Sequence, residues 1–160
     1  MAIARLTEFL DGHNAAYTVI YHSPTYTAQG VAALAHISGK ELAKTVIVKL
    51  DGKLTMAVLP AKFYVNLVSL KRAAQAHTAS LASEDEFKDR FAECEPGAMP
   101  PFGNLYGLPV FADDSLEQDT AIAFNAGTHR ELIRMYWADF KKLAEPIMVR
   151  FAAGQSAEAA

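Results

Sequence analysis

The chain has 160 residues, of which 51% are hydrophobic and 21% are charged, and its formal net charge is −3. These values indicate one globular domain with a sizeable core, and the acidic balance argues against a protein that coats nucleic acid non-specifically. No apolar run approaches the roughly 20 residues that a membrane-spanning helix needs, and the N-terminus lacks the apolar core of a signal peptide. The single cysteine, Cys94, fits a reducing compartment. We therefore expect a cytoplasmic protein with no membrane partner.

Helix and strand patterns alternate in the first half of the chain. Asp51-Gly52 lies between two apolar, β-branched runs, and this pair favours a tight hairpin because both turn positions need positive φ. The expected elements are a helix over 3–11, a strand over 16–22, a helix over 28–36, strands over 45–50 and 54–59, a helix over 66–76 and a short strand over 77–81.

The second half begins with a capping box, in which Ser83 and Glu86 predict a helix over 84–92. The stretch "CEPGAMPPFGNLYGLP" (94–109) has no period and is too apolar for a linker, which is typical of a binding loop or a packed Ω-loop. Further expected elements are strands over 109–113, 121–125 and 131–137, a helix over 138–144 and a strand over 147–151.

These elements predict an α/β (α+β) fold. We expect a compact single domain with a central curved, mostly antiparallel mixed sheet flanked by helices, because the hairpins disfavour a doubly wound sheet. The domain is expected to span 1–152, with a disordered tail over 153–160.

Charge is unevenly distributed along the chain. Residues 40–72 hold seven basic and two acidic residues, a balance of +5, whereas residues 84–119 hold ten acidic and two basic residues, a balance of −8. The basic segment is either a local anion site or a set of solvated faces. Within it, Lys44 stands where a buried strand is about to begin. On its own it is either a lysine whose stem packs at a strand end or a site residue.

Several familiar sites are missing from the sequence. It contains no P-loop, no dinucleotide glycine fingerprint and no Gly-x-Ser-x-Gly nucleophile elbow. The five histidines and one cysteine show no metal-ligand spacing, so we expect no metal and no cofactor. Cys94 is a packed hydrophobe rather than a nucleophile in this interpretation, because no partner base stands near it.

Four segments together resemble a known family. In this order and spacing, "TAQGVAALAHISGKELAKTVIVK", "GAMPPFG", "PVFADDSL" and "FNAGTHRELIRM" are similar to the YbaK/prolyl-tRNA-synthetase-associated editing-domain family, from about His22 to Phe151. The resemblance implies a compact fold around a curved sheet and hydrolysis of the ester of a small mischarged amino acid (cysteine, alanine, serine or threonine) on tRNA. It implies the acceptor end of a mischarged tRNA as a partner, with a synthetase as an optional second partner, but not DNA. It also implies a free-standing protein that edits in trans.

The resemblance also carries site residues. Lys44 matches the functional lysine of the family. Gly97 and Pro101 match the ends of its Gly-x-x-x-Pro loop, and Gly103 matches the glycine just beyond. Asp113 matches the acidic position, and Gly127 matches the glycine before the penultimate strand. His129 matches a position that varies among relatives. Backbone N–H groups of Gly97, Ala98, Met99, Phe102 or Gly103 are candidate donors to the reacting carbonyl, since proline has no N–H.

Structural roles are open for most of these residues. His22 is either a strand-end residue or part of the site, and His129 in its turn is either solvated or lines the site. Asp113 is either a helix cap or a site acid, and Phe102 or Tyr106 either stacks on adenine or packs within the loop. The alternative function is a non-catalytic member of the fold that binds tRNA, a nucleotide or a synthetase partner.

Overall fold

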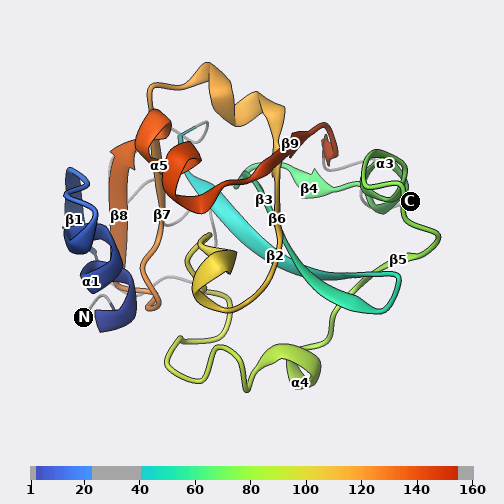
Figure 1. Cartoon of the computed structure of the whole chain (residues 1–160), viewed down its shortest axis with the longest axis horizontal. Helices are drawn as coiled ribbons and strands as arrows, with labels where there is room; N and C mark the ends of the chain where they lie inside the picture. Colours follow the sequence, from blue (N-terminus) through green and yellow to red (C-terminus); the bar gives the residue numbers. More distant parts are fainter. Residues whose placement is uncertain (1–2, 23–40, 155–160) are drawn as a thin grey trace.

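A five-stranded mixed sheet forms the centre of the computed structural model, which describes residues 3–22 and 41–154 (Figure 1). Its strand order is β5-β2-β3-β6-β9; the first two pairings are antiparallel, whereas β3-β6 and β6-β9 are parallel. The strands are β2 (Ala43–Leu50), β3 (Lys53–Pro60), β5 (Ala79–Leu81), β6 (Val110–Asp113) and β9 (Ile147–Val149). The expected mixed sheet is confirmed.

The hairpin between β2 and β3 forms as predicted. Asp51 and Gly52 have φ values of 52° and 80°, which fit the right-handed twist of the flanking strands. The Asp51 carboxylate also accepts the backbone N–H groups of His77 and Thr78, at 2.8 and 3.0 Å, and thereby holds the chain that leads into β5. These two bonds lower the pKa of Asp51, and the bond from Thr78 has the larger effect.

A second, antiparallel sheet stands beside the first, in the order β1-β8-β7. The two sheets meet where Leu42 bridges Ala123 and the Ala123 N–H donates to Glu41 O at 3.0 Å. A short third ladder pairs β4 with β10. The remaining elements are α1 (Ala4–Gly12), β1 (Tyr17–Tyr21), β4 (Tyr64–Val65), α3 (Leu67–Ala73), α4 (Glu84–Phe87), η1 (Gly103–Leu105), η2 (Asp114–Gln118), β7 (Ala121–Asn125), β8 (Glu131–Tyr136), α5 (Trp137–Ala144) and β10 (Ala152–Ala153).

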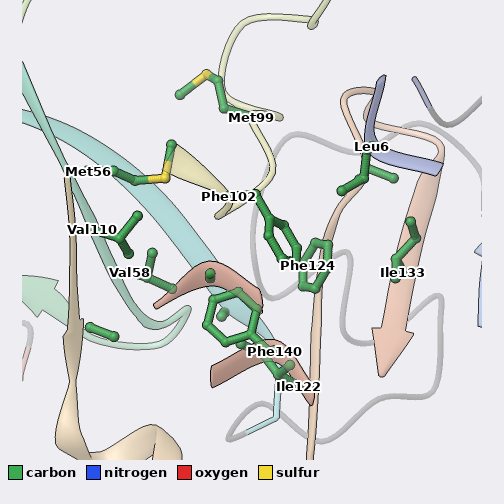
Figure 2. Close-up of a cluster of buried hydrophobic side chains, with 14 of the residues drawn as sticks. Leu6, Met56, Val58, Met99, Phe102, Val110, Ile122, Phe124, Ile133 and Phe140 are labelled. Carbon is green, nitrogen blue, oxygen red and sulfur yellow. The ribbon is translucent and has the colours of Figure 1, made fainter. Parts of the chain in front are cut away.

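The larger core fills the space between the two sheets and is rich in aromatic rings (Figure 2). Phe102 meets Phe124 and Phe140 edge to face, with ring centroids 5.7 and 5.1 Å apart. A second core lies on the opposite face of the central sheet, because side chains alternate along each strand. It contains Val48, Leu50, Ala57, Leu59, Val65, Leu70 and Phe151.

One expected helix is shorter than predicted. The Ser83–Glu86 capping box is present, but the α-helix ends at Phe87 rather than at residue 92. Beyond it, Arg90 N–H donates to Phe87 O and Phe91 N–H donates to Lys88 O. Both bonds join residues three apart, as in tight turns rather than in an α-helix, and Phe91 packs in the core.

The helix expected over 28–36 lies outside the described residues, as do residues 155–160 of the expected tail. Within the described ranges, no helix is long and apolar enough to cross a membrane.

Asp113 ties the C-terminal part of the chain to β6. Its side chain is 2% exposed, and one carboxylate oxygen accepts the backbone N–H groups of Phe151 and Ala152, at 2.8 and 2.7 Å. The other oxygen accepts the N–H of Ser115 at 3.1 Å and caps η2, so the predicted capping role is confirmed. All of these contacts are structural.

We predict that Asp113→Ala destabilises the protein by roughly 2–4 kcal/mol, because two buried backbone donors lose their acceptor. Urea denaturation followed by circular dichroism measures this. Asp114→Ala is the matched control: Asp114 is partly exposed and faces Arg150 at 3.5 Å, so its loss is expected to change stability little. A stable Asp113→Ala protein that has lost only activity would instead make Asp113 a site residue.

Candidate functional site

The proline-rich loop is locked to the turn between β7 and β8. Glu95 N–H donates to Gly127 O at 2.8 Å, and Gly127 N–H donates back to Ala98 O at 2.9 Å. The Glu95 carboxylate accepts the backbone N–H of His129 at 2.7 Å. Two segments about thirty residues apart in the chain therefore form one rigid unit, and the structure brings Gly97, Ala98, Gly127 and His129 together.

His129 is buried, at 6% exposure, so the alternative in which it is solvated is wrong. Its Nε2 lies 2.6 Å from the carbonyl oxygen of Pro96. A carbonyl oxygen only accepts, so Nε2 carries the proton and donates it. This bond fixes the ring beside Gly97, where an added methyl group would lie 3.6 Å from His129 Cε1.

Gly127 makes the turn possible. Its φ is 95°, and an added Cβ would stand 2.5 Å from Cγ2 of Ile3. Ile3 in turn donates its N–H to Ala126 O at 3.1 Å, so the start of the chain packs directly on this turn. Gly127 is thus needed for backbone conformation and packing.

Along the loop, exposure falls sharply after Gly97. Gly97 itself is exposed and has a φ of 82°, whereas all residues from Ala98 to Gly103 are buried. Phe102 has no exposed surface and Tyr106 only 7%, so their predicted alternative of stacking on adenine is wrong and both are core residues. Met99 also packs in the larger core, and Gly103 is held by close packing, since a Cβ there would lie 2.6 Å from Leu108 O.

The backbone donors of the loop are correspondingly few. Ala98 N–H donates to Glu95 O at 3.0 Å and is already used, and Pro100 and Pro101 have no N–H. The candidates for an incoming carbonyl are therefore the N–H groups of Gly97, Met99, Phe102 and Gly103. Of these residues only Gly97 is exposed to solvent.

Lys44 lies at the junction of the two sheets, two residues after the Leu42–Ala123 bridge. Its side chain is half-buried, and Nζ stands 4.5 Å from the ring centroid of Tyr64 in a cation–π contact. Strand alternation places its Cβ on the face of Val46 and Val48, which pack in the second core, whereas the loop packs in the first. The contacts among the described residues thus give Lys44 and the loop different faces of β2.

His22 follows β1 and donates its backbone N–H to Arg130 O at 2.9 Å, which places it at the same end of the second sheet as His129. Sequence reasoning missed Glu131, which pairs with Tyr21 and is only 2% exposed. The signal was present: Glu131 stands in alternation with Ile133 and Met135, which both face the core. Buried ionisable groups are frequent at functional sites.

Cys94 shows the features of a packed thiol. Its Sγ lies 3.6 Å from the hydroxyl oxygen of Tyr106, and burial raises the pKa of the thiol above its usual value. Among residues 3–22 and 41–154, no group of three or more His, Cys, Asp or Glu side chains is arranged to hold a metal ion.

Comparison with known proteins shows similarity in sequence to tRNA deacylases and to proline–tRNA ligases. Over 152 residues the chain is 30% identical to the multifunctional Ser/Thr-tRNA deacylase ProXp-y of Escherichia coli (strain K12), covering 92% of this chain and 90% of that protein. A shorter similarity, 29% over 86 residues, relates 54% of the chain to 15% of the proline–tRNA ligase of Bacillus mycoides (strain KBAB4).

Solved structures have the same fold. Hypothetical protein APE2540 superposes with a TM-score of 0.83 at 20% identity, covering 93% of this chain and 99% of that one. A candidate trans-editing enzyme for prolyl tRNA synthetase superposes with a TM-score of 0.81 at 19% identity, covering 94% and 96%. The family model of the aminoacyl-tRNA editing domain matches residues 22–143, and the chain therefore belongs to the aminoacyl-tRNA editing domain family.

Proposed function

We propose that this protein hydrolyses the ester between a small amino acid and the acceptor end of a mischarged tRNA, acting in trans. The observation that carries the proposal is the similarity over 90% of the length of ProXp-y, whose name describes a Ser/Thr-tRNA deacylase. Serine and threonine are accordingly the first substrates to test. The similarity to part of a proline–tRNA ligase supports a connection to proline-specific tRNA or its synthetase.

In this proposal the loop binds the reacting carbonyl. An aminoacyl ester is already labile, so a site that places water and stabilises the developing oxyanion is sufficient. Gly97 is exposed and lies beside the His129 ring. The bond from His129 to Pro96 O and the bonds of the flanking residues to Gly127 hold this arrangement before substrate arrives. Donors that need no reorganisation are the ones that stabilise a transition state most effectively.

Lys44 is proposed to bind a phosphate near the terminal nucleotide. Its ammonium lies at the sheet junction and over the Tyr64 ring, on the face away from the loop. A flexible four-carbon stem and a compact charge suit a phosphate contact that guides the ester toward Gly97.

The test is a single-turnover assay over a panel of tRNAs charged with serine, threonine, alanine, cysteine and the correct amino acid. We expect hydrolysis of at least one mischarged species and protection of the correctly charged one. Binding of these tRNAs without hydrolysis of any would overturn the proposal in favour of a non-catalytic binding protein.

We predict that Lys44→Met lowers the deacylation rate by on the order of a hundredfold while the protein stays folded, because a charge-assisted contact is lost and the aliphatic stem is kept. Lys44→Arg keeps the charge in a wider, planar group and is expected to be impaired as well. Single-turnover rates and melting temperatures are measured in parallel. A near-normal rate for Lys44→Met would reduce Lys44 to a packing residue.

A second substitution separates the loop's chemistry from its folding. Gly97→Ala has room for the methyl group, but its φ of 82° is unfavourable for alanine and is expected to cost about 1 kcal/mol of stability. We expect activity to fall by more than tenfold, beyond what this loss explains, since the methyl would intrude on the substrate. Gly12→Ala, in open space without positive φ, is the matched control. Unchanged deacylation would make the loop purely structural.

A further inference from the structure

A small pocket opens beside the turn that links β3 to β4. Its volume is about 250 Å³, and it lies between this turn and the 3-10 helix η2. Phe63 supplies a half-buried aromatic wall, and the Nζ of Lys62 stands 4.9 Å from the centroid of that ring. The lining residues are Pro60, Lys62, Phe63, Ser115, Gln118 and Asp119.

The lining residue Pro60 is one ladder position away from Lys44. Pro60 pairs with Ala43 in the ladder, and Leu59 pairs with Lys44 itself. Directly after Lys62 and Phe63 comes Tyr64, whose ring contacts the Lys44 ammonium. Two cation–aromatic pairs therefore follow one another along this rim.

The chain segment that supplies Lys62 and Phe63 is positively charged, whereas the opposite wall, formed by η2 and Asp119, is acidic. Residues 52–83 contain no aspartate or glutamate, and their basic residues are Lys53, Lys62, Lys71 and Arg72. Alternating aromatic rings and cations are what single-stranded nucleic acids bind, since bases stack on the rings and phosphates pair with the cations.

We propose that this pocket binds a base of the single-stranded 3′ end of tRNA, next to the nucleotide that carries the amino acid. The inference rests on the proposed function and adds a binding site to it. The base would stack on Phe63, and Lys62 would contact the adjoining phosphate.

The polar lining fits the bases at that end. Every tRNA ends in cytosine-cytosine-adenine, and each of these bases carries an exocyclic amino group. Asp119 offers a carboxylate that accepts from such a group, and Gln118 offers both a donor and an acceptor. A carboxylate in a pocket for a bare phosphate would be unfavourable, so the base, rather than the backbone, belongs inside.

The experiment compares two substrates that differ only in this part. Mischarged tRNA carries the preceding nucleotides, and an aminoacyl-adenosine with the same amino acid does not. For Phe63→Leu, which keeps the apolar bulk and removes the ring face, we expect kcat/KM on tRNA to fall about tenfold, mainly through KM, while hydrolysis of aminoacyl-adenosine is unchanged. Lys62→Ala is expected to behave alike. Lys88→Ala, an exposed lysine directly after α4 and outside this basic segment, is the charge-matched control and should affect neither substrate.

A binding measurement provides a readout without turnover. The labelled trinucleotide cytidylyl-cytidylyl-adenosine, followed by fluorescence anisotropy, should bind Phe63→Leu about tenfold more weakly than the wild type. If Phe63→Leu lowers kcat/KM equally on both substrates, or leaves tRNA kinetics and trinucleotide binding unchanged, the pocket does not bind this base. The proposed deacylase function would stand in either case. Failure of the wild type to hydrolyse any aminoacyl ester would overturn the proposed function itself.

Discussion

The hydrogen bonds between residues 95–98 and the turn at 127–129 are the constraint on which the candidate site depends. They join a proline-rich loop, which has no regular ladder of its own, to the end of an antiparallel sheet. The other end of the loop is anchored by Phe102 among the core rings. Glu95, Pro96 and Gly97 are exposed and residues 98–103 are buried, so Gly97 is the exposed residue among the candidate N–H donors of the loop. The same turn also receives Ile3, which couples the start of α1 to the site.

Burial explains why the motif residues divide into two kinds. Gly103 and Gly127 are required because a methyl group at either would meet neighbouring atoms well inside contact distance. Gly97 has open space around it, with His129 Cε1 at ordinary contact distance. A shared glycine signature thus combines two positions that hold the fold with one that is free to face a ligand. Asp113 belongs with the first kind, since its hydrogen bonds join the chain to itself.

Local signals predicted most elements correctly, because each depends on chemistry within a few residues. Asp51-Gly52 and the Ser83–Glu86 capping box are examples, and both formed as expected. The positions of site residues depend instead on long-range packing. Nothing near His129 in the sequence indicates that Pro96 lies against its ring, and nothing near Phe102 indicates that it enters the core. Strand alternation could have identified Glu131, and it could also have shown that Lys44 faces the second core rather than the loop.

The distribution of charge supports one direction of approach for tRNA. The chain is acidic overall, and Glu93 and Glu95 lie at the start of the loop, so a phosphate backbone lying along that side would be repelled. The segment 52–83, which holds no acidic residue and forms β3, β4 and α3, carries four basic residues and is the part of the chain expected to attract phosphates (Figure 1). Under the proposed function, a tRNA 3′ end that follows this segment would reach the sheet junction at Lys44, and only its aminoacyl ester, which carries no phosphate, would continue toward Gly97. Under the proposed function, the separate faces of Lys44 and the loop would keep the phosphates on one side of the junction and bring the reacting carbonyl to the other.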